Sequence, residues 1–288
     1  MRHKKLLHAA GALMLAMYAA PTLADDAGTR LSACLQLARD DPAAAVAQAG
    51  SRPSVTVKSD EADALQCLGT AQAGLGMWAQ AQASFMAAAK AALAQPDPDA
   101  RRLFALQAQA GNAALETGDA QTALYLFNAA LAAMRDVAIS GNAAAALHVD
   151  RARALAALSR TDHALAALTL AQLAEPRDST AFLLEASLAR RADDLARAAI
   201  AIAHADAITP GSPDILLEGG LIAAAAGNDR IAANAWRRIV EHAPDASAAP
   251  FARTYLEQLQ AARSASRSAG KPANNALAGA DPDWENQR

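Results

Sequence analysis

The chain is organised around residues 145–244, whose middle part, residues 179–212, reads STAFLLEASLARRADDLARAAIAIAHADAITPGS. Prolines recur here at a step of 34 residues, as Pro176, Pro210 and Pro244. Alanines keep the same step, and a larger apolar residue follows each by four positions. These pairs are Ala164 with Leu168, Ala198 with Ile202, and Ala232 with Trp236. A fixed period of about 20–50 residues is typical of stacked-repeat proteins.

Each 34-residue unit is predicted to form two short helices. In residues 179–212 these run from Phe182 to about Arg191 and from Leu195 to Asp206. Apolar residues of the second helix recur at helical spacing, and Pro210 ends it because proline cannot continue the hydrogen-bond ladder. One such pair cannot bury its apolar face alone, so neighbouring pairs must stack. The predicted fold class is all-α, an α-solenoid of stacked antiparallel helix pairs.

This pattern resembles the tetratricopeptide repeat (TPR) family, which has small residues at places 8, 20 and 27, an aromatic residue at place 24 and proline at place 32. Residues 62–103 match best, with Leu65, Leu68, Gly69, Gly76, Ala81, Phe85 and Ala88. The glycine of place 15 is replaced in two units, by Ser159 and Asp193. The resemblance covers residues 62–244 and implies a TPR-like superhelix.

The domain boundaries follow from the repeat. We expect a signal peptide at 1–24, a shortened helix pair with a loop at 25–61, a capping helix at 247–263 and a disordered tail at 264–288. Between them lie five units at about 62–103, 104–144, 145–178, 179–212 and 213–246, here called units two to six. The shortened pair is predicted at Leu31–Arg39 and Pro42–Ala49, with Asp40 or Asp41 as its cap, and Ser51–Lys58 as a polar loop.

The first residues are typical of a secretory signal. Arg2, Lys4 and Lys5 precede a short apolar run, and cleavage is expected after Ala24, which places the mature protein in the periplasm or outside the cell. No later stretch is predicted to cross a membrane. Without the signal the chain has 23 basic and 29 acidic residues, which argues against nucleic acid as a partner.

The two cysteines, Cys34 and Cys67, are predicted to form a disulfide, because an exported protein meets an oxidising compartment and both lie on first helices of neighbouring pairs. Free buried thiols are the alternative. Cys34 also follows Leu31-Ser32-Ala33, a sequence that resembles a lipoprotein box. Asp25, Asp26 and Arg30 separate this box from the apolar run, so an outer-membrane-anchored lipoprotein is the less favoured hypothesis.

The family resemblance also implies a binding surface, because first helices of TPR proteins line a concave groove. The positions that face it include the candidate peptide-binding residues Gln66, Thr70, Asn112, Arg153, Ser187 and Arg190. An asparagine at the place of Asn112 often bonds the backbone of a bound peptide in this family. Arg153 and Arg190 are expected to add positive charge. Asp150 and Leu184 depart from the family's chaperone-tail clamp, which argues against that specific function.

No catalytic, metal-binding or cofactor motif is found in the sequence, and few aromatic residues are available to wall a small-molecule pocket. The resemblance therefore implies a non-enzymatic scaffold of the bacterial envelope that binds an extended peptide or a partner protein. One rival is an assembly or biogenesis factor that uses convex or terminal surfaces. The other is an enzyme with an unrecognised site.

Overall fold

The computed structural model describes residues 23–50, 58–135, 138 and 140–268, and all regular structure in these residues is helical. The first six helices are α1 (Leu23–Asp40), α2 (Pro42–Gly50), α3 (Lys58–Gly74), α4 (Trp78–Leu93), α5 (Ala100–Glu116) and α6 (Ala120–Ala133). The next six are α7 (Gly141–Ala157), α8 (Thr161–Ala174), α9 (Ser179–Arg191), α10 (Leu195–Ile208), α11 (Pro213–Ala225) and α12 (Asp229–His242). The last is α13 (Ala248–Ser268). The prediction of an all-α solenoid is confirmed.

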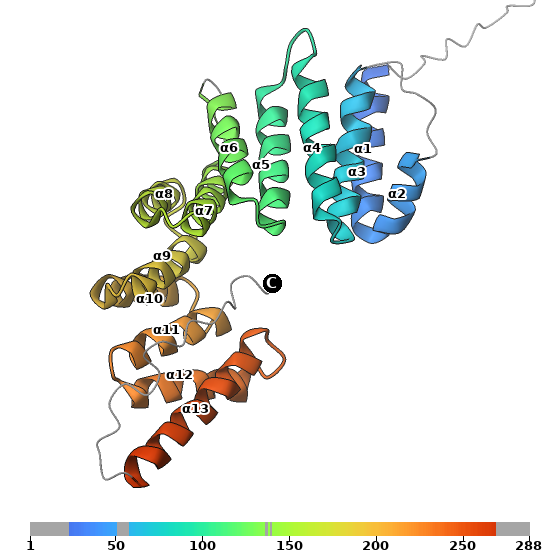
Figure 1. Ribbon diagram of the computed structural model, residues 1–288. Coiled ribbons are helices and arrows are strands. Elements are labelled where there is room, and N and C mark those ends of the chain that lie inside the picture. The colour runs from blue at the N-terminus through green and yellow to red at the C-terminus, as the bar shows by residue number, and fades with distance from the viewer. Residues whose placement is uncertain (1–22, 51–57, 136–137, 139, 269–288) are drawn as a thin grey trace, which may run out of the picture.

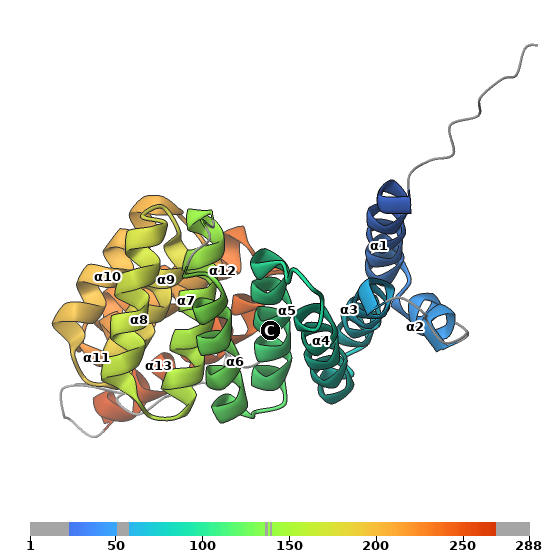
Figure 2. The same cartoon turned by 90° about the horizontal axis from the view of Figure 1, so that it is seen from above.

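The helices stack as successive pairs along a curved array (Figure 1). Helices α3 to α6 stand upright in this view, whereas α10 to α12 lie across it, so the array twists along its length. Figure 2 shows the same twist from above, with α1 and α2 at one end and the later units gathered at the other. First helices of units three to six (α5, α7, α9 and α11) contact one another directly, and the second helices approach each other less closely. The array therefore curves toward its first helices.

Within a unit, the two helices meet where a small residue of the first faces a large residue of the second. A Cβ atom added to Gly111 would lie 2.5 Å from the ring of Phe127, and one added to Gly69 would lie 2.8 Å from Phe85. A Cβ atom added to Gly220 would likewise clash with the side chain of Trp236. Such distances are far below van der Waals contact, so a larger residue at these glycines would displace the facing aromatic ring.

The turn between the two helices closes in the same way in all five units. Gly76, Gly118 and Gly227 have φ angles of 69°, 79° and 76°. Ser159 and Asp193 replace glycine at this place and still adopt φ angles of 58° and 61°. The backbone hydrogen bonds also agree, since Arg160 N donates to Leu155 O and Met77 N donates to Gln72 O. This is the pattern of a helix that ends in a left-handed residue, and in units four and five it is formed against the conformational preference of the side chain.

Aspartates begin many of the helices, as expected for acceptors that satisfy free N–H groups. Asp41, not Asp40, accepts from Ala44 N in the shortened pair. Asp194 accepts from Arg197 N at the start of α10, while Asp193 occupies the left-handed turn before it. In both cases the second aspartate of an Asp-Asp pair caps the second helix.

The first helices of units two, three and four each have 17 residues, whereas those of units five and six have 13. The extra residues form one additional turn that precedes each matched repeat. They supply about half of the extra residues by which the starts of units two, three and four lie 42 and 41 apart and not 34; a longer α4 and longer connections to the next unit supply the rest.

Both ends of the array differ from the predicted helix bounds. Helix α1 begins at Leu23, before the predicted Leu31, and its first turns include alanine and leucine, which favour helix. The cleavage point after Ala24 falls inside α1, and the rest of the predicted signal, residues 1–22, lies outside the described residues. The loop prediction at 51–57 also lies outside them, and Lys58 already begins α3. Helix α13 continues past Arg263 to Ser268, so the first five residues of the predicted disordered tail are helical; residues 269–288 lie outside the described residues.

The last helix packs one apolar face onto the array. Tyr255 and Leu259 are buried, Phe251 and Leu256 are partly buried, and all four belong to a cluster with Trp236. Ala232 and Ala233 are both buried in this cluster. The repeat pattern predicts that the residue after the alanine of place 20 is less constrained than that alanine. This is wrong in unit six, because Ala233 is buried in the cluster that α12 forms with α13. It holds in unit five, where Ala198 is buried and Ala199 is exposed.

Cys34 of α1 and Cys67 of α3 form a disulfide, as the sequence predicted. Around it lies a small cluster built mainly from alanines, in which Ala38, Ala45 and Ala71 are buried. Because a sulfur in a disulfide cannot carry a lipid, this bond argues against Cys34 as a lipid-bearing residue. None of the described helices combines the length and the hydropathy needed to cross a bilayer.

Candidate binding surface on the first helices

The predicted peptide-binding residues lie on four first helices, and their exposure differs strongly. Asn112 on α5 and Arg153 on α7 are exposed, whereas Gln66 and Thr70 on α3 are half-buried. The Thr70 hydroxyl donates to the carbonyl oxygen of Gln66, one turn earlier on the same helix. Ser187 on α9 is only 1% exposed, so its side chain does not reach the surface, contrary to the expectation.

Asn112 and Arg153 are brought together by a carboxylate between them. Arg153 Nη1 donates to Asp150 Oδ1 at 3.0 Å, and the side chain of Asn112 lies near enough to Asp150 to lower the pKa of its carboxyl. The Asp150 side chain is 16% exposed, whereas that of Arg153 is 52% exposed. The carboxylate therefore lies beneath the two polar groups. We call Asn112, Asp150 and Arg153 the polar triad.

Burial raises the pKa of the Asp150 carboxyl above its ordinary value, and the neighbouring Arg153 and Asn112 oppose that shift. Loss of water around the carboxylate thus outweighs the two stabilising contacts. The triad is a polar contact between units three and four, whereas from the sequence Asp150 is only a departure from a family pattern. Its place three residues before Arg153 on one helix is the signal that identifies it, because such residues are neighbours on a helix surface.

The second predicted cation, Arg190, does not add net charge to the surface. Its Nε donates to Glu218 Oε1 at 2.6 Å and Nη2 donates to Glu218 Oε2 at 3.4 Å. Glu218 is fully buried on α11, and the Arg190 side chain is 9% exposed. This ion pair joins units five and six in the interior. The expectation that Arg190 contributes positive charge to a groove is therefore wrong.

Large apolar side chains that remain exposed lie on the other side of the array. Among the described residues they are Met86 and Leu93 of α4, Tyr125 of α6, Leu170 and Leu173 of α8, Ile200 of α10, Ile231 of α12 and, in a turn, Leu75. None lies on a first helix. The second-helix surface is thus the more apolar face, and the first-helix surface is the more polar one.

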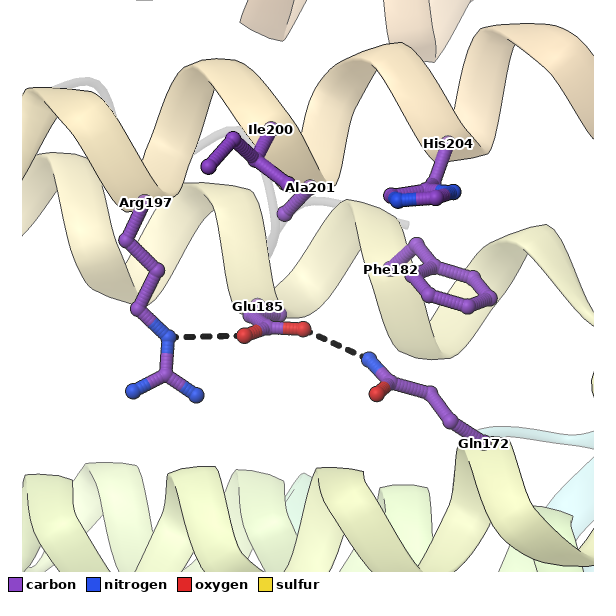
Figure 3. A pocket seen from close by; sticks show the side chains of 7 residues that line it. All are labelled: Gln172, Phe182, Glu185, Arg197, Ile200, Ala201 and His204. Atoms are coloured by element: carbon purple, nitrogen blue, oxygen red, sulfur yellow. Dashed lines mark hydrogen bonds and ion pairs between the residues drawn. The ribbon is translucent and has the colours of Figure 1, made fainter.

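A pocket of about 380 Å³ opens between α8 and α10, with α9 as its floor (Figure 3). Glu185 spans this floor, since its two carboxylate oxygens accept from Arg197 Nε at 2.7 Å and from Gln172 Nε2 at 2.6 Å. Phe182 stacks on His204, with ring centroids 5.4 Å apart. The polar groups of the floor are largely paired with each other, so the pocket offers an apolar wall and few free donors or acceptors.

No catalytic, metal or cofactor site was predicted, and the described residues contain no group of three histidine, cysteine, aspartate or glutamate side chains placed to hold a metal ion. Half-buried His148 has its pKa lowered by burial and by the nearby Arg151.

The architecture is similar to that of several proteins with solved structures. No protein-family model matches the chain, and no curated protein sequence matches it. Solved structures do match. PilW, a widely conserved type IV pilus biogenesis factor, is 19% identical with a TM-score of 0.63, over 78% of this chain and 97% of that one.

Two further structures agree over similar lengths. PilF of Pseudomonas aeruginosa is 13% identical with a TM-score of 0.56, over 80% of this chain and 99% of that one. BtubC of P. vanneervenii is 15% identical with a TM-score of 0.56, over 81% of this chain and 90% of that one. Together with the 34-residue repeat, the glycine–aromatic contacts and the left-handed turns, this agreement shows that the chain has the tetratricopeptide-repeat fold.

Proposed function

We propose that the protein is a non-enzymatic scaffold for protein–protein interaction that binds an extended peptide segment on its first-helix surface. The observation that carries this proposal is the polar triad. It holds two exposed hydrogen-bonding side chains, Asn112 and Arg153, on adjacent first helices at the inner side of the curve. A peptide backbone needs both donors and acceptors from its partner, and the triad offers both.

The experiment is a capture assay from envelope extract with the purified full chain as bait. We expect a specific partner that is retained by the native chain and lost when Asn112→Ala and Arg153→Glu are combined. Arg237→Glu is the matched control, because Arg237 is an exposed arginine on the second helix α12. Equal retention by the native and double-variant chains would contradict binding at the triad. The partner's segment is then confirmed with a synthetic peptide.

A second candidate function is supported by the exposed apolar residues of the second helices. Leu173 and Ile200 are 74% and 63% exposed and belong to neighbouring units. Exposed apolar side chains that recur along one surface are typical of protein-binding faces. In this alternative the protein is an assembly or biogenesis factor that docks through its convex side. Partner loss in Leu173→Glu with Ile200→Glu, but not in the triad variants, supports it.

We also propose that the protein is exported to the periplasm or beyond. The disulfide supports this, because such bonds persist in oxidising compartments. PilW is described as a pilus biogenesis factor, which agrees with an envelope setting for a protein of this fold. N-terminal sequencing of protein from its native host is expected to begin at Asp25. An intact Met1 in the membrane fraction contradicts release from the membrane, and a lipid on Cys34 contradicts cleavage after Ala24.

A further inference from the structure

The pocket between α8 and α10 lies on the second-helix side of the array, away from the polar triad (Figure 3). Its apolar walls are Ile200 with Ala201 and the stacked rings of Phe182 and His204. Ile200 is 63% exposed, so an occupant that covers it removes apolar surface from water. A volume of about 380 Å³ is enough for one bulky side chain and too small for another helix.

The edge of this pocket carries a cation that keeps donors for a ligand. Arg197 binds Glu185 through Nε at 2.7 Å, and this contact leaves both Nη nitrogens of the guanidinium for other acceptors. The Arg197 side chain is 38% exposed, whereas that of Glu185 is 14% exposed. The pocket thus combines an apolar wall with an accessible guanidinium. It suits a large apolar side chain that has carboxylates beside it.

The chain itself contains a segment with this chemistry. Residues 269–288, here called the C-terminal tail, include one aromatic side chain, Trp284. Asp281, Asp283 and Glu285 all lie within three residues of it. A tryptophan buries about 150–250 Å² when it is enclosed, and a carboxylate can accept charge-assisted hydrogen bonds from a guanidinium. The indole matches the apolar wall, and the carboxylates match Arg197.

The tail is long enough to place Trp284 in this pocket. Trp284 lies 16 residues after Ser268, the end of α13, and an extended chain of that length spans roughly 55 Å. Helices α10 to α13 contact one another in succession, at spacings of about 10 Å. Helix α13 lies across α12 and is about 32 Å long, which puts Ser268 within roughly 45 Å of the pocket. In Figures 1 and 2 the C-terminal end of α13 lies toward the same side of the array as α10.

We propose that the pocket between α8 and α10 binds Trp284 of the chain's own C-terminal tail, with Arg197 paired to the carboxylates of Asp283 and Glu285. The contact is intramolecular and covers Ile200. A partner that docks on this part of the second-helix surface must then displace the tail. The inference goes beyond the proposed function, because the pocket is separate from the first-helix surface.

The test is ¹⁹F NMR of the full chain with 5-fluorotryptophan at its three tryptophans. Trp284→Phe identifies the resonance of Trp284. We expect this resonance to be displaced from its position in a synthetic peptide of residues 279–288, because the pocket encloses the indole. Ile200→Glu is expected to return it to the peptide's position. Ile231→Glu, at an exposed isoleucine of the next second helix, is the matched control and leaves it displaced.

The resonance of Trp236, which is fully buried in unit six, reports in the same spectrum that each variant is folded. A Trp284 resonance at the peptide's position in the native chain overturns the proposal. So does one that stays displaced in Ile200→Glu while that of Trp236 is unchanged. An intramolecular contact does not depend on concentration. A Trp284 resonance that returns to the peptide's position on dilution shows binding between copies and overturns the assignment to the chain's own pocket.

The charge match is tested by changing the tail alone, so that every helix keeps its native residues. Asp283→Asn combined with Glu285→Gln is expected to raise the ratio of free to bound Trp284 by about fivefold, the loss expected for two exposed ion pairs. Lys271→Gln changes the charge of the tail far from Trp284 and is expected to leave the ratio unchanged. A ratio that the double variant does not change overturns the pairing with Arg197.

Discussion

In units three and four, which are neighbours, the contact between the first and second helix is filled by different pairs of side chains. In unit three Gly111 faces Phe127, and both are buried. In unit four the same places hold Ala152 and Leu168, which are also fully buried. A larger residue on one helix is matched by a smaller one on the other, so the contact stays filled. Total volume across a contact is therefore what the fold requires, and the individual residue is not.

The turns of the two units also differ, and here unit four carries the less suitable residue. Unit three closes its turn with Gly118, whereas unit four places Ser159 in the same left-handed conformation. The alanine–leucine contact avoids a clash, but the serine turn carries a conformational cost. The comparison predicts where each unit tolerates substitution and where it does not.

The largest expected effect concerns the alanine at place 20, which is shared by units with a glycine turn and by units without one. Ala123 of unit three and Ala198 of unit five are fully buried. Ala198→Leu is expected to lower the free energy of unfolding by about 3 kcal/mol, because added methylenes force backbone shifts in a filled contact. Ala199→Leu, at an exposed neighbouring position, is expected to change it by less than about 0.5 kcal/mol. Urea denaturation of both variants provides the measurement, and equal losses would show that the repeat register is wrong.

The next effect tests the size match directly. Gly111→Ala is expected to cost about 2 kcal/mol, because its Cβ would lie 2.5 Å from Phe127. Adding Phe127→Leu recreates the Ala152–Leu168 contact in unit three and should restore part of the loss. Phe127→Leu alone leaves a cavity beside Gly111 and serves as the control. If the double variant is no more stable than the sum of the single changes predicts, the two places are not coupled.

A smaller effect is expected at the turns, and its sign is opposite in the two units. Ser159→Gly relieves the left-handed strain and should stabilise unit four by about 0.5–1 kcal/mol, after the entropy of glycine in the unfolded chain is counted. Gly118→Ser introduces that strain into unit three and should destabilise by a similar amount. Asp193→Gly should gain less than Ser159→Gly, because aspartate tolerates this conformation better. Thermal unfolding midpoints test the order.

The smallest effect concerns the contact between the two units. The folded-state pKa of Asp150 is raised mainly by burial, so the folded state binds a proton more readily there than the unfolded chain does. Protonation of Asp150 therefore contributes relative stability as the pH falls through the raised value, and this contribution is absent at neutral pH. Native protein should gain stability relative to Asp150→Asn between neutral pH and about pH 4. A difference between the two proteins that does not depend on pH would contradict the shift.

Much of the fold followed from the sequence because the repeat places residues by size and period. The helix bounds agree with the 34-residue step, with the prolines that follow the second helices and with the position of Ala198 in α10. These features can be read from the sequence of each unit alone. The disulfide followed from the stacking of first helices. The extents of α1 and α13 did not, since alanine-rich segments extend a helix without any distinct end signal.

The candidate site was harder to predict, because exposure depends on the neighbouring unit. Ser187 occupies the same repeat place as the exposed Asn112 and Arg153 but is enclosed, and Arg190 turns inward to Glu218. Ala233 was similarly misjudged because α13 covers it. A repeat pattern describes each unit by itself. It does not state which surface the next element covers.

The disulfide between α1 and α3 also has a mechanical consequence. It closes a covalent ring whose two cysteines are 33 residues apart. When the chain is pulled from its two ends, this segment cannot lengthen, which removes about 110 Å from the fully stretched contour. The same bond lets tension bypass α2 and enter the array directly at Cys67. The later units, which have no covalent cross-link among their described residues, would then extend first. The disulfide-linked segment at the N-terminal end would resist extension under the same force.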